Sequence, residues 1–129
     1  MSDSIETGNA SSLKGEKGIV RILKATRYSM MGLRTAFLNE AAFRQLVLIN
    51  LVLQPIALSL DVTRAERAVL MIVPLLSLAI ELLNTAVENV VDRVSLELHP
   101  LSKNAKDMGS AAQFIGLVMI VVAWLVVLV

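Results

Sequence analysis

The stretch MGSAAQFIGLVMIVVAWLVVLV, residues 108–129, carries no charged side chain on any face. A helix of this length is about 33 Å long at 1.5 Å per residue, enough to cross the roughly 30 Å hydrocarbon core of a bilayer. A helix of a water-soluble bundle would need a charged outer face, which this stretch lacks. The C-terminal stretch therefore predicts a transmembrane helix.

Two earlier stretches, residues 45–60 and 68–80, are also free of charge, and the second extends to Val91 if two carboxylates are accepted within it. The first is shorter than the roughly 20 residues that a span needs, so the transmembrane helix must also include residues 41–43. Thr63 and Glu66 fit the capping-box pattern, which predicts a helix start at Arg64. We therefore expect an all-α membrane protein with transmembrane helices at about 41–60, 64–94 and 108–129.

The N-terminal part of the chain is polar or amphipathic. Residues 1–15 are rich in Ser and Gly and lack apolar periodicity, which predicts a disordered polar head. In residues 18–38, a helical wheel separates an apolar arc from a basic arc, which predicts a helix lying on the membrane surface. The basic side chains would face lipid phosphates or a polyanionic substrate. Anchoring of the helix to anionic lipid explains these basic residues as well as substrate binding does. The apolar arc comprises Ile19, Ile22, Leu23, Met30, Leu33 and Phe37, and the basic arc Arg21, Lys24, Arg27 and Arg34.

The distribution of basic residues predicts the orientation in the membrane. Seven Lys and Arg precede the first span, two lie between the first and second, and three lie between the second and third. The positive-inside rule then puts the N-terminal region and the 92–107 loop in the cytoplasm. The 61–67 loop and Val129 lie on the opposite, periplasmic or outer side.

The composition excludes several function classes. The 129 residues contain 12 Lys and Arg against 11 Asp and Glu, a net charge of +1, so no overall basic field favours nucleic acid as a partner. Without cysteine, thiol catalysis and Cys-ligated metal sites are excluded. With His99 as the single histidine, any metal must be held mainly by carboxylates, which favours a hard ion such as Mg²⁺.

A polar stripe runs along the otherwise apolar second span. On a helical wheel its six residues fall within an arc of about 100°. They are Ser77, Glu81, Asn84, Thr85, Glu88 and Asp92. An acidic residue in a membrane helix costs roughly 2.5–3.5 kcal/mol on insertion scales, so two or three on one face need a function or a structural partner, such as arginines of a neighbouring helix.

The depth of the acidic residues suggests a role for each. Counted from Ala68 at 1.5 Å per residue, Glu81 lies about 20 Å into the bilayer and Glu88 about 30 Å, at the cytoplasmic surface, where Glu40 also lies. A buried glutamate suits a general base for a hydroxyl, and two surface carboxylates suit Mg²⁺. The chain has no GxxxxGK[ST] loop and no GxGxxG motif, so proton relay, ion conduction and lipid chemistry all remain open from the residues alone.

Several motifs, taken together and in this order, resemble the prokaryotic integral-membrane diacylglycerol kinase family. The resemblance runs from about Gly18 to the C-terminus. The matching motifs are RILKATRYS (residues 21–29), GLRTA (32–36), NEAAFRQ (39–45), ELLNTAVENVVDR (81–93) and AKDMGSAA (105–112).

The resemblance implies a single membrane-embedded kinase domain over residues 16–129, a homotrimer in the bacterial inner membrane, which transfers the γ-phosphoryl group of MgATP to diacylglycerol and yields phosphatidic acid. It implies Glu81 and Asn84 as catalytic residues, with Glu81 as the base, and Glu40 and Glu88 as Mg²⁺ ligands. The implied nucleotide-binding residues are Arg21, Tyr28, Glu40, Glu88, Glu97, His99, Lys106 and Asp107. The implied lipid-substrate residues are Arg21, Ser29, Arg34, Arg44, Gln45, Glu81 and Ser110.

Other functions stay open at this point. Undecaprenol kinase is the alternative within the same family. An oligomeric proton or cation conduit lined by Glu81 and Asn84, or a structural membrane adaptor, would belong to other classes. The small residues Gly109, Ser110, Ala112 and Gly116 favour close helix packing, either between subunits or within one chain.

Overall fold

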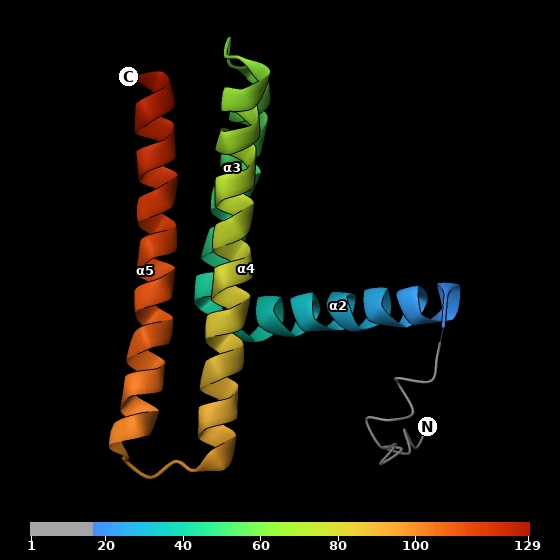
Figure 1. The fold of residues 1–129 in the computed structure, drawn as a ribbon, viewed down its shortest axis with the longest axis vertical. Coiled ribbons are helices and arrows are strands. Elements are labelled where there is room, and N and C mark those ends of the chain that lie inside the picture. Colours follow the sequence, from blue (N-terminus) through green and yellow to red (C-terminus); the bar gives the residue numbers. More distant parts are fainter. Residues whose placement is uncertain (1–16) are drawn as a thin grey trace. The chain divides into compact units, whose positions relative to one another are not determined.

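The computed structural model describes residues 17–129, and this part of the chain is entirely helical, without strands. The elements are α2 (Ile19–Asn39), α3 (Ala41–Ser59), α4 (Arg64–Val94) and α5 (Pro100–Leu128) (Figure 1). The expected polar head, residues 1–15, lies outside the described residues. Three of the helices, α3, α4 and α5, are long and apolar enough to cross a membrane. The predicted all-α architecture with three membrane-spanning helices is therefore confirmed.

The chain forms two compact units, the first ending at Thr35 and the second spanning Ala36–Val129. Most of α2 belongs to the first unit. Gly18, just before α2, has a φ of 74°, a left-handed conformation that glycine adopts at little cost. All but one of the residues from 19 to 35 are exposed, which agrees with an amphipathic helix that keeps its apolar arc for lipid.

In the second unit, α4 packs against both α3 and α5 (Figure 1). A buried amide, that of Asn50, and a partly buried one, that of Gln54, tie α3 to α4. The Asn50 amide donates to the carbonyl of Pro74 at 3.1 Å, and the Gln54 amide donates to the carbonyl of Met71 at 2.9 Å. Backbone polar groups have no water to bind in hydrocarbon, so such bonds between helices add specificity to an otherwise apolar contact.

The start of α4 is as predicted, and the start of α5 is not. The Thr63 side chain accepts from the Glu66 amide, and the Thr63 amide donates to the Glu66 carboxylate, both at 3.2 Å, so the capping box is present. Helix α5 begins at Pro100, eight residues before the expected span. His99 caps it and proline occupies its first position, which keeps the polar residues 100–107 helical.

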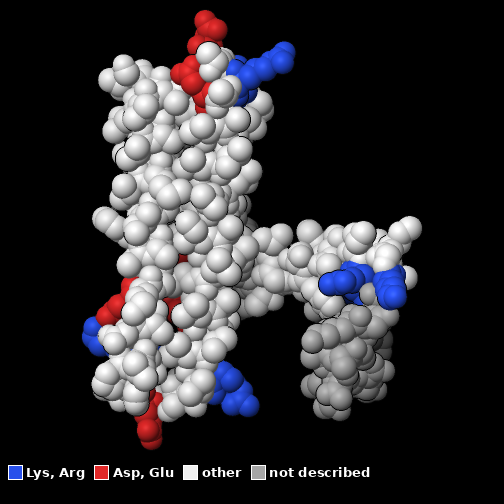
Figure 2. Space-filling model, in the orientation of Figure 1, with Lys and Arg blue, Asp and Glu red and all other residues white. Residues whose placement is uncertain are grey.

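In Figure 2 the charged side chains of the helical bundle lie at its upper end and over its lower part, with an uncharged band between them. Between these ends the surface is apolar, and many large side chains stand exposed, including Leu51, Val90 and Val126. A contiguous apolar surface of this kind belongs in a bilayer or against another subunit. The 61–63 turn and the C-terminus share one end, and the 95–99 loop forms the other (Figure 1).

Two arginines close the turns between helices. The Arg44 guanidinium donates to the carbonyls of Phe37 and Leu38 at 2.8 and 3.2 Å, at the end of α2. The Arg67 guanidinium donates to four carbonyls at and after the end of α3. The acceptors are Ala57 (2.6 Å), Leu58 (2.8 Å), Leu60 (3.0 Å) and Val62 (3.5 Å). A cation here also offsets the negative end of the helix dipole.

We expect Arg67→Met to lower the free energy of unfolding by about 1.5–3 kcal/mol, because hydrogen bonds from a charged donor to otherwise unpaired carbonyls are lost. Unfolding in mixed micelles of a mild detergent and dodecyl sulfate measures the effect. Arg64→Met is the matched control, since Arg64 lies three residues away and is exposed. Equal losses for both variants would contradict the assigned role of Arg67.

Candidate active site

The polar stripe of α4 is turned into the bundle, not toward lipid. Ser77 is 0% exposed and Glu81 4% exposed, and Asn84 and Thr85 are also buried. Glu88, one turn further on, is half-buried, and Asp92 is exposed near the end of the helix. The predicted common face is therefore present, and it leads from a buried carboxyl to the polar end of the bundle. A buried carboxyl in a membrane helix marks a candidate functional site.

Glu40 joins this face from a different helix. It stands at the break between α2 and α3, with an extended backbone (φ −118°, ψ 110°), at the N-cap position of α3, where its side chain makes no capping hydrogen bond. Glu40 and Glu88 both lie near enough to Glu81 for their charges to act on it. Carboxylates from two elements thus act on Glu81, although residues 17–129 contain no group of three or more His, Asp or Glu that could together hold a metal ion.

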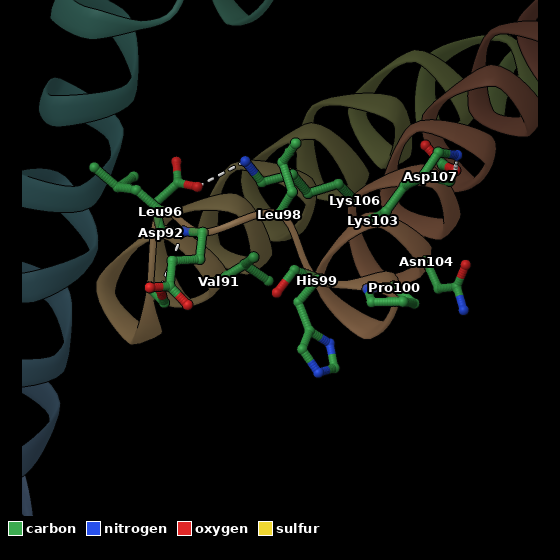
Figure 3. A pocket seen from close by; sticks show the side chains of 13 residues that line it. Val91, Asp92, Leu96, Leu98, His99, Pro100, Lys103, Asn104, Lys106 and Asp107 are labelled. Carbon is green, nitrogen blue, oxygen red and sulfur yellow. Dashed lines mark hydrogen bonds and ion pairs between the residues drawn. The ribbon is translucent and has the colours of Figure 1, made fainter.

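A cavity of about 730 Å³ lies at the polar end of the bundle, between the end of α4, the 95–99 loop and the start of α5 (Figure 3). Four of the predicted nucleotide-binding residues line it. They are Glu97, His99, Lys106 and Asp107. Lys103 and Asn104, which were not predicted as site residues, line it too. The signal that could have found Lys103 is its spacing of three residues from Lys106, which puts it on the neighbouring turn of the same helix. The volume lies in the range of small-molecule sites.

Two ion pairs order the cavity wall. The Lys106 ammonium lies 2.6 Å from the Asp92 carboxylate, which joins α5 to α4, and the Lys103 ammonium lies 2.5 Å from Asp107 within α5 (Figure 3). Glu88 also acts on Lys106 electrostatically. Lys106, in the cavity wall, therefore lies within electrostatic reach of Glu88. The role of Asp92, left open by the sequence, is in this structure a partner for that lysine.

His99 has a structural task within the cavity. Its Nδ1 accepts a hydrogen bond from the Leu101 amide at 3.1 Å and so caps α5. An accepting Nδ1 is unprotonated, which leaves Nε2 as the nitrogen able to donate. The ring is exposed at the cavity, so the same side chain fixes the helix start and faces the hollow.

The remaining predicted residues lie on exposed surfaces. Arg21, Tyr28, Ser29 and Arg34 are exposed on α2, in the unit that ends at Thr35, and the Ser29 hydroxyl donates to the Ala25 carbonyl at 2.9 Å. On the bundle, Gln45 and Ser110 are exposed as well. Arg44 is exposed, and its guanidinium is engaged in capping α2.

The glycines of α5 pack within the chain. A side chain at Gly109 would meet Asn84, and one at Gly116 would meet Ser77, so both glycines let α5 approach α4. For these two residues the packing is thus within one chain. Ser110 and Ala112 are exposed and remain free for other contacts.

Known proteins are similar to this chain over most of its length. Residues 27–128 match the family described as prokaryotic diacylglycerol kinase. The chain belongs to this family. The diacylglycerol kinase of Pseudomonas aeruginosa is 62% identical over 118 residues, which cover 92% of this chain and 96% of that protein. The diacylglycerol kinase of Escherichia coli K12 is 47% identical over 111 residues (86% and 91%), and that of Helicobacter pylori strain 26695 is 43% identical over 108 residues (84% of each).

Membership of the diacylglycerol kinase family confirms the predicted family and the predicted enzymatic activity. A kinase of this family uses ATP and diacylglycerol, and the three apolar helices make the chain a multi-pass membrane protein. The conduit and the adaptor are thereby set aside as the main function. The roles of individual site residues remain predictions.

Proposed function

We propose that the chain phosphorylates diacylglycerol at the cytoplasmic membrane surface, with Glu81 as general base. The observation that carries this proposal is the burial of Glu81 inside the bundle, within electrostatic reach of Glu40 and Glu88. A carboxylate at this depth can meet a hydroxyl that stays anchored in the bilayer by its acyl chains. Phosphoryl transfer needs positioning and charge neutralisation more than covalent chemistry, so a conventional nucleotide-binding fold is not required.

In the proposed step, the lipid hydroxyl oxygen forms a bond to the γ-phosphorus of ATP, and the bond from that phosphorus to the β-phosphate oxygen breaks. Glu81 takes the hydroxyl proton. Asn84, one turn further along α4 and buried on the same face, orients the reacting groups. The products are phosphatidic acid and ADP.

Mg²⁺ fits the donor set on this face. It commonly binds one or two carboxylates and fills its remaining positions with water and phosphate oxygens, so Glu40 and Glu88 suffice without a third protein ligand. When bound, Mg²⁺ would neutralise charge that develops on the transferred phosphoryl group.

The cavity at the polar end of the bundle is our candidate for the nucleotide. Lys106 supplies a positive charge beside it, and His99, Glu97 and Asp107 supply polar contacts. Arg21 and Tyr28 of α2 complete the proposed nucleotide set. Diacylglycerol would contact Arg21, Ser29, Arg34, Arg44, Gln45 and Ser110 in addition to Glu81.

We further propose a homotrimer in the bacterial inner membrane with the N-terminus in the cytoplasm. The exposed apolar sides of α3, α4 and α5 support burial against lipid and other subunits, and the basic residues before α3 support the orientation. Native mass spectrometry measures the subunit number. Because the chain has no cysteine, single cysteines introduced at Ser2 and Val129 report the orientation by their accessibility to impermeant reagents.

Transfer of the γ-phosphate of radiolabelled ATP into organic-extractable lipid tests the function. We expect phosphatidic acid to form from diacylglycerol, to depend on Mg²⁺, and to exceed the product from undecaprenol. A faster reaction with undecaprenol would favour the alternative substrate within the family. Label in neither lipid, together with ATP-independent ion flux in liposomes, would overturn the proposal.

A further inference from the structure

We propose that Gly109 is a positioning residue for the kinase reaction, because the absence of a side chain there leaves the space in which the Asn84 amide lies. The inference rests on the proposed role of Asn84 beside Glu81. It concerns a residue of α5 that contacts neither substrate in the proposed mechanism and acts only through its neighbour on α4.

The contact between the two residues is unusually close. A Cβ built on Gly109 would overlap the Asn84 side-chain oxygen and would stand 3.3 Å from Asn84 Cγ and 3.9 Å from Asn84 Cα. The amide oxygen therefore occupies the place where any other residue would begin its side chain. Asn84 is buried, and its oxygen has no hydrogen-bond partner within the described part of the chain. The NH₂ end of the same amide hydrogen-bonds the Glu81 carboxylate, so the amide is held between Glu81 at its nitrogen and Gly109 at its oxygen.

Gly116, the other glycine of α5, is less tightly packed than Gly109. Gly116 lies seven residues further along α5 and faces Ser77, which lies seven residues before Asn84 on the antiparallel α4. A Cβ there would stand 3.3 Å from Gln113 Oε1 and Ile80 Cδ1, and 3.4 Å from Ser77 Oγ. These neighbours need to give way only by tenths of an ångström. At Gly109, by contrast, the Asn84 amide must rotate away.

The consequence of rotation follows from the position of Asn84. It lies three residues after Glu81 on the same buried face, so a displaced amide no longer stands beside the proposed base. A misplacement of about 1 Å in an active site can cost about 100-fold in rate. The amide is the free end of a short side chain, so α4 and α5 can remain packed while it moves.

We expect Gly109→Ala to lower kcat about 100-fold, with little change in KM for ATP or diacylglycerol. Gly116→Ala, the matched control, should stay close to the native rate. Combining Gly109→Ala with Asn84→Ala should lower kcat no further than Asn84→Ala alone, because both changes remove the same positioned amide. In ¹⁵N spectra the side-chain amide signal of Asn84 should shift in Gly109→Ala and not in Gly116→Ala.

Native kcat in Gly109→Ala, with Asn84→Ala impaired, would overturn the proposal. Native kcat in Asn84→Ala would count against the proposed role of Asn84 instead, and the amide signal would still report whether Gly109 sets its position. If Gly109→Ala does not fold, the double variant with Asn84→Ala should, because the shortened side chain vacates the space. A double variant that also fails to fold would overturn the proposal, because a side chain at residue 109 would then clash with the backbone of α4 and not with the Asn84 amide.

Discussion

Glu81→Gln should lower lipid phosphorylation by about 10²- to 10⁴-fold in kcat, the range that removal of a general base produces. Glutamine has nearly the same shape as glutamate and cannot take the proton of the lipid hydroxyl. Because an uncharged amide costs less than a carboxylate in an apolar interior, the variant should fold at least as well as the native chain. Radiolabel transfer from ATP to diacylglycerol, in the same detergent micelles for both proteins, measures the loss.

The control for this change is Asp61→Asn, which makes the same chemical substitution at an exposed residue in the connection between α3 and α4. It should leave kcat and both KM values unchanged. The KM for ATP should change little in Glu81→Gln, because Glu81 faces the lipid hydroxyl in the proposed step and the nucleotide is held elsewhere. A variant with native kcat would show that another group accepts the proton.

Most of the fold could be predicted because membrane helices depend on features that a sequence displays directly. A span of uncharged residues predicts α3, and the capping box at Thr63 fixes the start of α4. The early start of α5 was missed because the expected span followed the apolar run alone. The signal was present, since proline is common at the first position of a helix, but Pro100 lies in a polar region where hydropathy gives no information.

Only the part of the candidate site that lies on a single helix could be predicted. The spacing along α4 predicts that Ser77, Glu81 and Asn84 share a face, and their burial agrees. The approach of Asn84 to Gly109 depends on the register of α4 against α5, which the 95–99 loop sets. Helical periodicity gives no information about that register, so the contact between Asn84 and Gly109, which are 25 positions apart, could not be predicted from it.

The ion pair between Asp92 and Lys106 is likewise a contact between two helices that periodicity does not predict. It leaves two possible roles for Lys106. The lysine could serve the structure, by joining α5 to α4, or the nucleotide, by facing its phosphates. The two side chains are 46% and 44% exposed, and an ion pair in such surroundings contributes at most about 1 kcal/mol to stability. Loss of the pair should therefore change stability little, and the two roles have to be separated by activity measurements.

Lys106→Met should lower kcat/KM for ATP by about 100-fold if the ammonium stabilises the charge of the transferred phosphoryl group, a contribution of about 2.7 kcal/mol. Steady-state kinetics at saturating diacylglycerol measure it, and thermal unfolding in detergent should show little change. Lys103→Met is the matched control. Lys103 lines the same cavity and pairs with Asp107, but its side chain is 76% exposed, so we expect a much smaller effect.

Exchanging the two charges separates the structural role of Lys106 from the nucleotide role. In the double variant Asp92→Lys with Lys106→Asp, opposite charges still face each other between α4 and α5, so a purely structural role would be restored. A phosphate-binding role would not be restored, because a carboxylate would then stand on α5 where the ammonium was, within electrostatic reach of the acidic Glu88. We expect kcat/KM for ATP to remain as low as in Lys106→Met, or to fall further through repulsion of the phosphates. Recovery toward the native value would assign Lys106 to the joint between the helices and remove it from the nucleotide site.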